Sequence, residues 1–167
     1  MAPRITIHRA TPADIPFVMA VERIPGHDAF INLWTAEEHA AALAGPDHAY
    51  LVATGPDGTP AGFAILSDLR DPHGNICLKR IAMAAPGRGL GAPFLRAVTA
   101  WTYGSTAAHR LWLYVVATND RARHVYRAQR FAEEGTLREA RLEADGTRTA
   151  LILMSLLRRE WGAATGH

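Results

Sequence analysis

The sequence has few of the residues that build cross-linked, metal-bound or membrane-spanning proteins. Cys77 is the only cysteine in 167 residues, which excludes an internal disulfide, and no cysteine and histidine cluster has the spacing of a structural zinc site. No apolar run approaches the ~20 residues that a membrane-spanning helix needs, and no cleavable apolar segment stands at the start. We therefore expect a cytoplasmic protein that binds neither a metal nor a membrane.

An excess of basic charge is also absent. The formal net charge is +2, and Lys79 is the only lysine, so the electrostatic footprint of a nucleic-acid-binding protein is missing. Hydrophobic residues make up 49% and charged residues 20%, as in ordinary globular domains. The length suits one hydrophobic core, so we predict a single domain over residues 1–161, followed by a frayed tail over 162–167.

Hydrophobic patterning predicts strands and helices in alternation. Strands are expected over 4–9, 49–54, 61–67, 76–83, 111–116, 131–143 and 147–157. Helices are expected over 12–21, from the capping box at Thr35 to Gly45, after the glycine-rich stretch 87–91, and from Asn119 to about 129. Residues 22–34 fit neither period and are predicted to form an irregular, partly helical loop. This order predicts an α/β (α+β) fold, a mixed sheet with helices on both faces.

The glycine-rich turn at 87–91 lies between a predicted strand and a predicted helix. Such a turn presents unpaired backbone N–H groups and the positive end of the helix dipole, which suit a pyrophosphate. A plain structural turn can have the same composition. The stretch also lacks the Gly-Lys-Ser/Thr of a P-loop and the acidic residue of a dinucleotide fingerprint. The turn therefore predicts a phosphate site only together with a second motif.

The second motif directly follows the apolar strand and contains Asn119, Ala122 and Tyr126. With it, the chain resembles the GNAT superfamily of acetyl-CoA-dependent N-acetyltransferases over nearly its whole length. The likeness is to the branch whose members acetylate ribosomal-protein N-termini and small amines. Phe131 ends the family's usual Gly-Phe pair, and Arg130 replaces its glycine. Asn119 and Tyr126 are seven residues apart, about two helical turns, so both can face one site.

The family's phosphate motif is Arg or Gln, two residues, Gly, one residue, then Gly or Ala. It maps onto Arg88, Gly91 and Pro93, where Pro93 departs from the usual small residue. We place Pro93 at the first position of the helix, where proline is tolerated but removes one N–H group from the phosphate cradle. A register shifted to Gly87, Gly89 and Gly91 would put Pro86 at the Arg/Gln position.

The resemblance implies a sheet that splays into a V between two parallel strands, 76–83 and 111–116, with acetyl-CoA as cosubstrate in the gap. The coenzyme then behaves as an extra strand that bonds main-chain groups near Ile81 and Met83. The full set of coenzyme-binding residues implied by the resemblance is Ile81, Met83, Arg88, Gly89, Leu90, Gly91, Ala92, Pro93, Asn119 and Tyr126. The family's relatives are often dimers, which suggests a homodimer here.

Acetyl transfer to an amine needs a deprotonated amine, a stabilised oxyanion and a proton for the leaving thiolate. The resemblance gives the last role to Tyr126, although its ring could instead only pack under the sheet. Many relatives carry a glutamate as general base where this chain has Cys77. A water chain or a side chain could replace it, the candidates being Glu22, His27, Asp28 and His73.

The acceptor side has aromatic and acidic candidates that remain open. Phe30 and Trp34 could line an acceptor pocket or pack the loop onto the sheet, and the acidic run 133–139 could attract a cationic amine or be a solvated strand edge. We predict direct acetyl transfer from acetyl-CoA to a primary amine of a small molecule or a peptide. Cys77 and Pro93 leave room for a non-catalytic acyl-CoA-binding module of the same fold, and a dimerisation scaffold is a further alternative.

Overall fold

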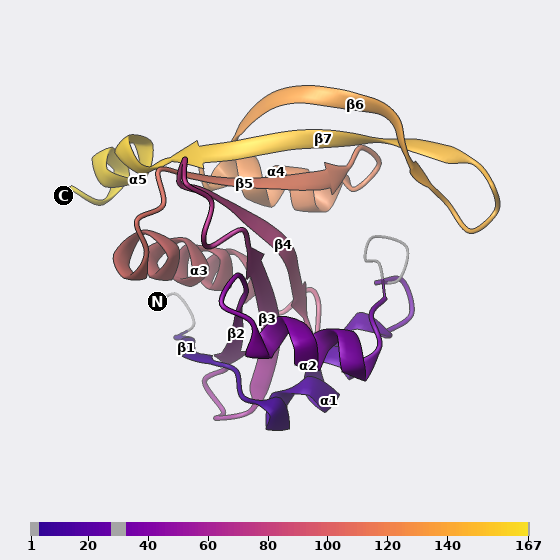
Figure 1. The fold of residues 1–167 in the computed structure, drawn as a ribbon, viewed down its shortest axis with the longest axis vertical. Coiled ribbons are helices and arrows are strands. Elements are labelled where there is room, and N and C mark those ends of the chain that lie inside the picture. Colours follow the sequence, from indigo (N-terminus) through magenta and orange to yellow (C-terminus); the bar gives the residue numbers. More distant parts are fainter. Residues whose placement is uncertain (1–3, 28–32, 167) are drawn as a thin grey trace.

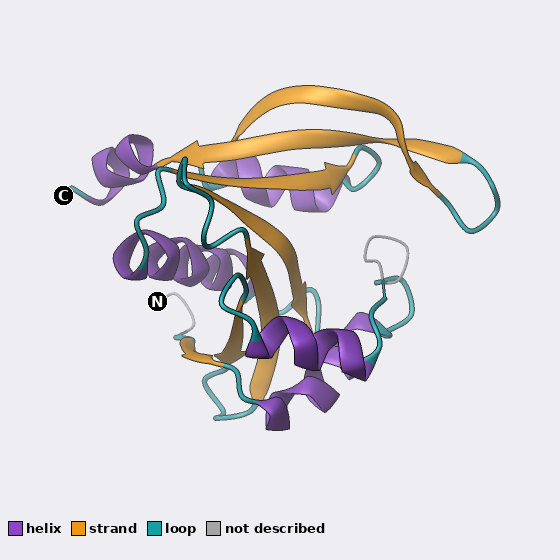
Figure 2. Ribbon diagram, viewed as in Figure 1, coloured by secondary structure: helices purple, strands orange, loops and turns teal. Residues whose placement is uncertain are grey.

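The computed structural model describes residues 4–27 and 33–166, which form one seven-stranded sheet with helices on both faces (Figures 1 and 2). The strands follow the order β1-β2-β3-β4-β5-β7-β6 across the sheet. Their bounds are β1 Thr6–Arg9, β2 Ala49–Thr54, β3 Pro60–Ser67, β4 Asn75–Met83, β5 Arg110–Val116, β6 Ala132–Leu142 and β7 Arg148–Leu157. Each of the predicted strands is present within a few residues of its expected bounds.

The sheet opens between β4 and β5, the one parallel pair among the described strands. Strands β4 and β5 pair over three positions, from Asn75 opposite Arg110 to Cys77 opposite Trp112, whereas the other neighbouring strands are antiparallel. Beyond these pairs β4 continues to Met83 and β5 to the end of its own run, with no further pairing between them in the described structure. This confirms the predicted V (Figure 1).

A bulge in β4 lies just past the point where the strands separate. Ile65 of β3 pairs with Arg80 and Leu66 pairs with Leu78, so Lys79 is the extra residue between two ladder positions. An extra residue shifts the alternation of side chains by one. As a result Leu78 belongs to the core on one face of the sheet, and Arg80 turns to the other face, where it meets α1.

Two hydrophobic cores lie on the two faces of the sheet. The helices η1 (Pro12–Asp14), α1 (Ile15–Glu22) and α2 (Ala36–Ala44) cover one face, and α3 (Gly91–Ser105) and α4 (Asp120–Ala128) cover the other (Figure 1). The predicted capping box opens α2: the backbone N–H of Glu38 donates to Thr35 Oγ1 at 3.2 Å, and the N–H of Thr35 donates to Glu38 Oε2 at 2.7 Å.

The expectation of a frayed tail over 162–167 is wrong for most of that segment, because α5 (Arg158–Thr165) continues through it. The Trp161 ring stacks on the ring of Tyr103 in α3, with 5.3 Å between centroids. The Arg158 guanidinium donates to three carbonyl oxygens where α3 ends, those of Tyr103, Thr106 and Ala108, at 2.9, 2.9 and 2.6 Å. These bonds satisfy carbonyls that a helix end leaves unpaired. None of the helices within residues 4–27 and 33–166 has the length and apolarity to cross a membrane.

Candidate active site

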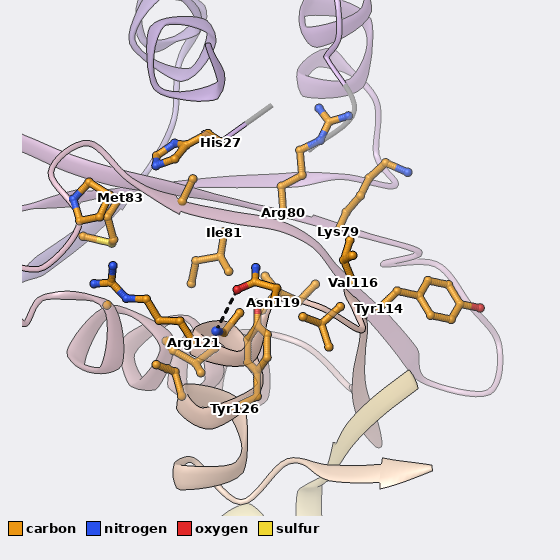
Figure 3. A pocket seen from close by; sticks show the side chains of 18 of the residues that line it. His27, Lys79, Arg80, Ile81, Met83, Tyr114, Val116, Asn119, Arg121 and Tyr126 are labelled. Carbon is orange, nitrogen blue, oxygen red and sulfur yellow. Dashed lines mark hydrogen bonds between the residues drawn. The ribbon is translucent and has the colours of Figure 1, made fainter. Parts of the chain in front are cut away.

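A cavity of about 1160 Å³ fills the V between β4 and β5 (Figure 3). It is walled by both strands, by the glycine-rich loop before α3, by the first turns of α4 and by part of the β6–β7 hairpin. Pockets for one drug-sized ligand typically measure ~300–1000 Å³, so this cavity has room for an extended ligand and a second, smaller one.

The glycine-rich loop forms one end of the cavity, which residues 87–92 line. Gly87 and Gly89 have φ of 88° and 74°, a left-handed backbone that favours glycine. The first intrahelical bond of α3 runs from the N–H of Phe94 to Leu90 at 3.0 Å, so the amides of the preceding helical residues are not used within the helix. Unused amides at a helix N-terminus form an anion site.

Pro93 occupies the third position of α3, not the first, because the helix starts at Gly91. Its missing N–H costs no intrahelical bond at this place, since the first four amides of a helix have no partner in it. Pro93 is also the one member of the predicted coenzyme set that is not among the described residues lining the cavity. The part of the predicted phosphate motif that lines the cavity therefore consists of the residues before Pro93.

The free end of β4 brings Ile81 and Met83 to the cavity wall (Figure 3). Behind this end, β3 approaches so closely that a Cβ atom on Gly62 would lie 2.6 Å from the carbonyl oxygen of Ala82 and 2.9 Å from the sulfur of Met83. Glycine at position 62 thus lets β3 support the part of β4 that has no partner on its other side.

The second motif brings Asn119 and Tyr126 together at the cavity, across from the free end of β4, and their spacing predicted that both face one site (Figure 3). Asn119 caps α4, because its Oδ1 accepts a hydrogen bond from the backbone N–H of Ala122 at 3.2 Å. Tyr126 is partly buried, and its ring lies 5.8 Å from that of Phe131. Burial raises the pKa of Tyr126 to about 12, so the phenol keeps its proton through the neutral range. The side chain therefore both packs and faces the cavity.

The departure at Arg130 falls on a special backbone position. Arg130 has φ of 69°, which a residue with a side chain adopts only at a cost, and this explains why a glycine would suit the position. The turn it makes lets the N–H of Phe131 reach the carbonyl of Tyr126 at 3.0 Å. Arg130 therefore keeps the turn that ends α4, although its left-handed backbone costs more conformational energy than that of a glycine would.

Glu22 is engaged in a buried ionic network and does not face the cavity. Its carboxylate is fully buried and accepts from Arg80 Nη1 at 2.9 Å and from His39 Nε2 at 2.9 Å. His39 Nδ1 lies 2.8 Å from the Tyr50 hydroxyl. The guanidinium of Arg80 also lies over the ring of Trp34, 4.3 Å from its centroid. Trp34 therefore packs the segment before α2 onto β4 and is not among the lining residues described.

The remaining base candidates have different positions. Cys77 lines the cavity, but burial raises its pKa to about 11, so it is a protonated thiol at neutral pH. His27 lines the cavity with Nδ1 2.9 Å from the carbonyl oxygen of Val21. His73 is not among the described residues that line it. Asp28 and Phe30 lie outside the described residues.

The acidic run on β6 is turned toward basic partners. Glu133 is bound by Arg123 and Arg127, which holds its pKa below the usual range, and Glu134 is bound by Arg110 with the same effect. None of the described residues 133–139 lines the cavity. The run is therefore a solvated, ion-paired strand edge, the second of the two readings of the sequence.

In the comparison with protein families, the model of the acetyltransferase (GNAT) family matches residues 19–131. The chain belongs to this family. The predictions of a GNAT superfamily member and of an acetyl-CoA-dependent N-acetyltransferase are thereby confirmed.

Solved structures with the same fold include several of the spermidine N-acetyltransferase SpeG from Vibrio cholerae. A mutant of SpeG has a TM-score of 0.84 at 17% identity, over 96% of this chain and 98% of that one. The structure of SpeG in complex with CoA and spermine has a TM-score of 0.83 at 17% identity, over 94% of this chain and 97% of that one. A dodecameric structure of SpeG has a TM-score of 0.79 at 18% identity, over 94% of this chain and 95% of that one. These likenesses confirm the predicted mixed α/β fold.

The GNAT cavity also contains residues that the motifs did not predict. Trp112 and Tyr114 of β5 form an edge-on aromatic pair, 5.0 Å between centroids, on the face opposite the phosphate loop's helix. Tyr114 and Leu142 are large hydrophobic residues whose exposed fractions are 46% and 61%, and both line the cavity. Alternation along β5 could have placed its aromatic residues on one face, whereas Leu142 comes from a distant hairpin.

Proposed function

We propose that this GNAT enzyme binds acetyl-CoA in the V between β4 and β5 and transfers the acetyl group directly to a primary amine of a small molecule or peptide. The observation that supports it most is the loss of pairing after three residue pairs, beside a glycine-rich helix N-terminus. Free N–H and C=O groups on the edge of β4 suit the amides of pantetheine, which then add to the sheet like a strand.

The coenzyme's charged end fits the loop end of the cavity. The backbone amides of Gly89, Gly91 and Ala92 would hold the pyrophosphate, and Arg88 and Arg121, which both line the cavity, supply positive charge. Ile81 and Met83 would bond the pantetheine through their main chain, and Asn119 and Tyr126 close the opposite wall. Leu90 completes the loop.

Tyr126 is proposed as the acid that protonates the departing thiolate. A thiol has a pKa of ~8.5, so full transfer from a phenol whose pKa is about 12 would be uphill by roughly 5 kcal/mol if it came first. The transfer is therefore concerted with cleavage of the C–S bond and loss of the amine's proton, so that no free tyrosinate accumulates. A thioester attacked directly needs no acyl-enzyme, and the protonated Cys77 thiol is a poor nucleophile for one.

The acceptor is proposed to be a small amine or a peptide N-terminus. SpeG, whose fold this chain shares, has been solved with CoA and spermine. The aromatic pair on β5 and the cavity carboxylates of Asp47 and Asp68 supply contacts that suit an ammonium group. We further propose that the chain works in the cytoplasm as a homo-oligomer, a homodimer being the simplest case. The dodecameric SpeG and the open edge of β6 support assembly.

The proposal is tested by thiol release from acetyl-CoA over a panel of amino acids, polyamines, aminoglycosides and short peptides with free N-termini. We expect release with at least one amine, and we expect Tyr126→Phe to lower kcat by ~10- to 1000-fold with little change in coenzyme affinity. His124→Ala, an exposed residue of α4 that is not among the described residues lining the cavity, is the control. Binding of acetyl-CoA in a calorimeter without thiol release on any amine would favour the non-catalytic module.

A further inference from the structure

A row of polar side chains crosses the sheet where β4 and β5 separate. Cys77 pairs with Ser67 of β3 on one side and with Trp112 of β5 on the other, which is the last pair before the V opens. His48 directly precedes β2, whose first pair with β3 lies one residue before Ser67. Continuing that register places His48 opposite Ser67. Opposed residues of neighbouring strands present their side chains on the same face, so all four share one face at the closed end of the cavity.

The surroundings of His48 are built from three elements. The His48 ring lies edge-on to the ring of Trp34, 6.2 Å between centroids. The same indole ring contacts Lys79 Nζ at 5.3 Å and the Arg80 guanidinium at 4.3 Å, the two residues at the bulge of β4. The Trp34 ring therefore lies against both His48 and the bulge of β4. Past this bulge, β4 has no partner on the side of β5, and its free amides could stabilise an oxyanion. His48 itself lines the cavity.

Burial favours the neutral form of the His48 imidazole. Burial is the largest effect on the pKa of His48 and lowers it, Lys79 lowers it further, and the carboxylates of Asp47 and Asp68 act in the opposite direction. A half-buried, unprotonated imidazole under the influence of two carboxylates can take up a proton, because the resulting cation is stabilised by those charges.

Other cavity groups are less suited to that role. The Cys77 thiol and the Tyr126 phenol hold their protons in the neutral range. Glu22 does not face the cavity, and its carboxylate is bound by Arg80 and His39. His27 also lines the cavity, but one of its nitrogens is engaged with the carbonyl of Val21.

We propose that His48 is the general base that removes the proton of the acceptor amine, directly or through one water. This assignment rests on the proposed function. The imidazole accepts one proton from the acceptor's ammonium group, and the freed lone pair forms the C–N bond with the acetyl carbon. The C–S bond then breaks, and the Tyr126 hydroxyl gives its proton to the thiolate. In the same step the Tyr126 oxygen takes the second proton from the nitrogen. His48 returns its proton to solvent, so one ammonium and one thioester give one amide, one thiol and one proton.

The test compares His48→Ala with His27→Ala, using the fastest amine of the panel above. We expect His48→Ala to lower kcat at pH 7.5 by ~100- to 1000-fold with an unchanged KM for acetyl-CoA. The loss should shrink as the pH approaches the ~10.4 of an alkyl ammonium, because the amine is then already free. Added imidazole should restore part of the rate. A residue that only supported the fold would show neither the pH dependence nor the rescue.

The outcomes separate this assignment from the function on which it rests. Three results would overturn the role of His48 while leaving the acetyltransferase activity intact. They are a fall in kcat of less than threefold for His48→Ala, a fall that is equal at every pH, and a fall that occurs in His27→Ala instead. A wild-type chain that binds acetyl-CoA and releases no thiol with any amine overturns the proposed function itself. A melting temperature within a few degrees of wild type and unchanged coenzyme binding show that the variant is folded.

Discussion

The ion pair between Glu22 and Arg80 provides a sharp test of how the α1 and α2 helices are held on β4. Glu22 is fully buried and the Arg80 side chain is 5% exposed, so neither charge is solvated to a useful extent. Removing one partner of such a pair leaves a buried charge without compensation, which costs about 3–5 kcal/mol. In Glu22→Ala the Arg80 guanidinium would keep only its contact with the Trp34 ring, and His39 would lose its carboxylate partner.

We therefore expect Glu22→Ala to lower the free energy of unfolding by about 3–5 kcal/mol. For a chain of this size that corresponds to a fall in melting temperature of roughly 6–20 °C. Urea denaturation followed by far-UV circular dichroism measures it, with Glu37→Ala, an exposed glutamate of α2, as the control that should change stability by about 0.5 kcal/mol or less. A loss under 1 kcal/mol for Glu22→Ala would refute the reasoning, because the pair would then be solvated or dispensable.

Two further predictions concern the cavity. Because burial raises the pKa of Cys77 to about 11, its thiolate is scarce below that pH, and alkylation by iodoacetamide at pH 8 should be on the order of 100-fold slower than that of free cysteine; an equal rate would contradict the burial. Gly62→Ala should weaken acetyl-CoA binding in calorimetry, because its Cβ would push on the Ala82 carbonyl. Gly104→Ala, in open space within α3, should leave binding unchanged, and equal binding by both variants would contradict the close approach.

Local patterns were enough to predict most of the elements and half of the site. Alternation and capping located the strands and helices, and the two motifs located Arg88, Asn119 and Tyr126, which all line one cavity. The helix α5 was missed because its anchor is not local: Arg158 donates to carbonyls about fifty residues earlier in the chain. The apolar signal of that segment is weak, and only docking against Tyr103 makes it a helix.

The acceptor side could not be predicted because its residues meet through strand register and burial. Glu22 was a reasonable base candidate by residue type, but its partner Arg80 lies 58 residues away, and no local pattern shows that the two are paired. The bulge at Lys79 likewise depends on how β4 aligns with β3. The place of His48 in the same row as Cys77 depends on the alignment of β2, β3 and β4, which the sequence does not show.

The buried ion pair has a functional consequence that its stability alone does not explain. In the proposed binding mode, β4 leaves one edge unpaired for the coenzyme. Its position then depends on β3 and on the anchor between Arg80 and Glu22 just past the bulge. Apolar residues of similar volume often match a buried ion pair in stability, but they lack its directional hydrogen bond. We therefore expect the double variant Glu22→Leu/Arg80→Met to recover most of the stability that Glu22→Ala loses, within about 2 kcal/mol of wild type. It should still bind acetyl-CoA several-fold more weakly. Wild-type coenzyme affinity in a stable double variant would show that β3 alone fixes the edge of β4.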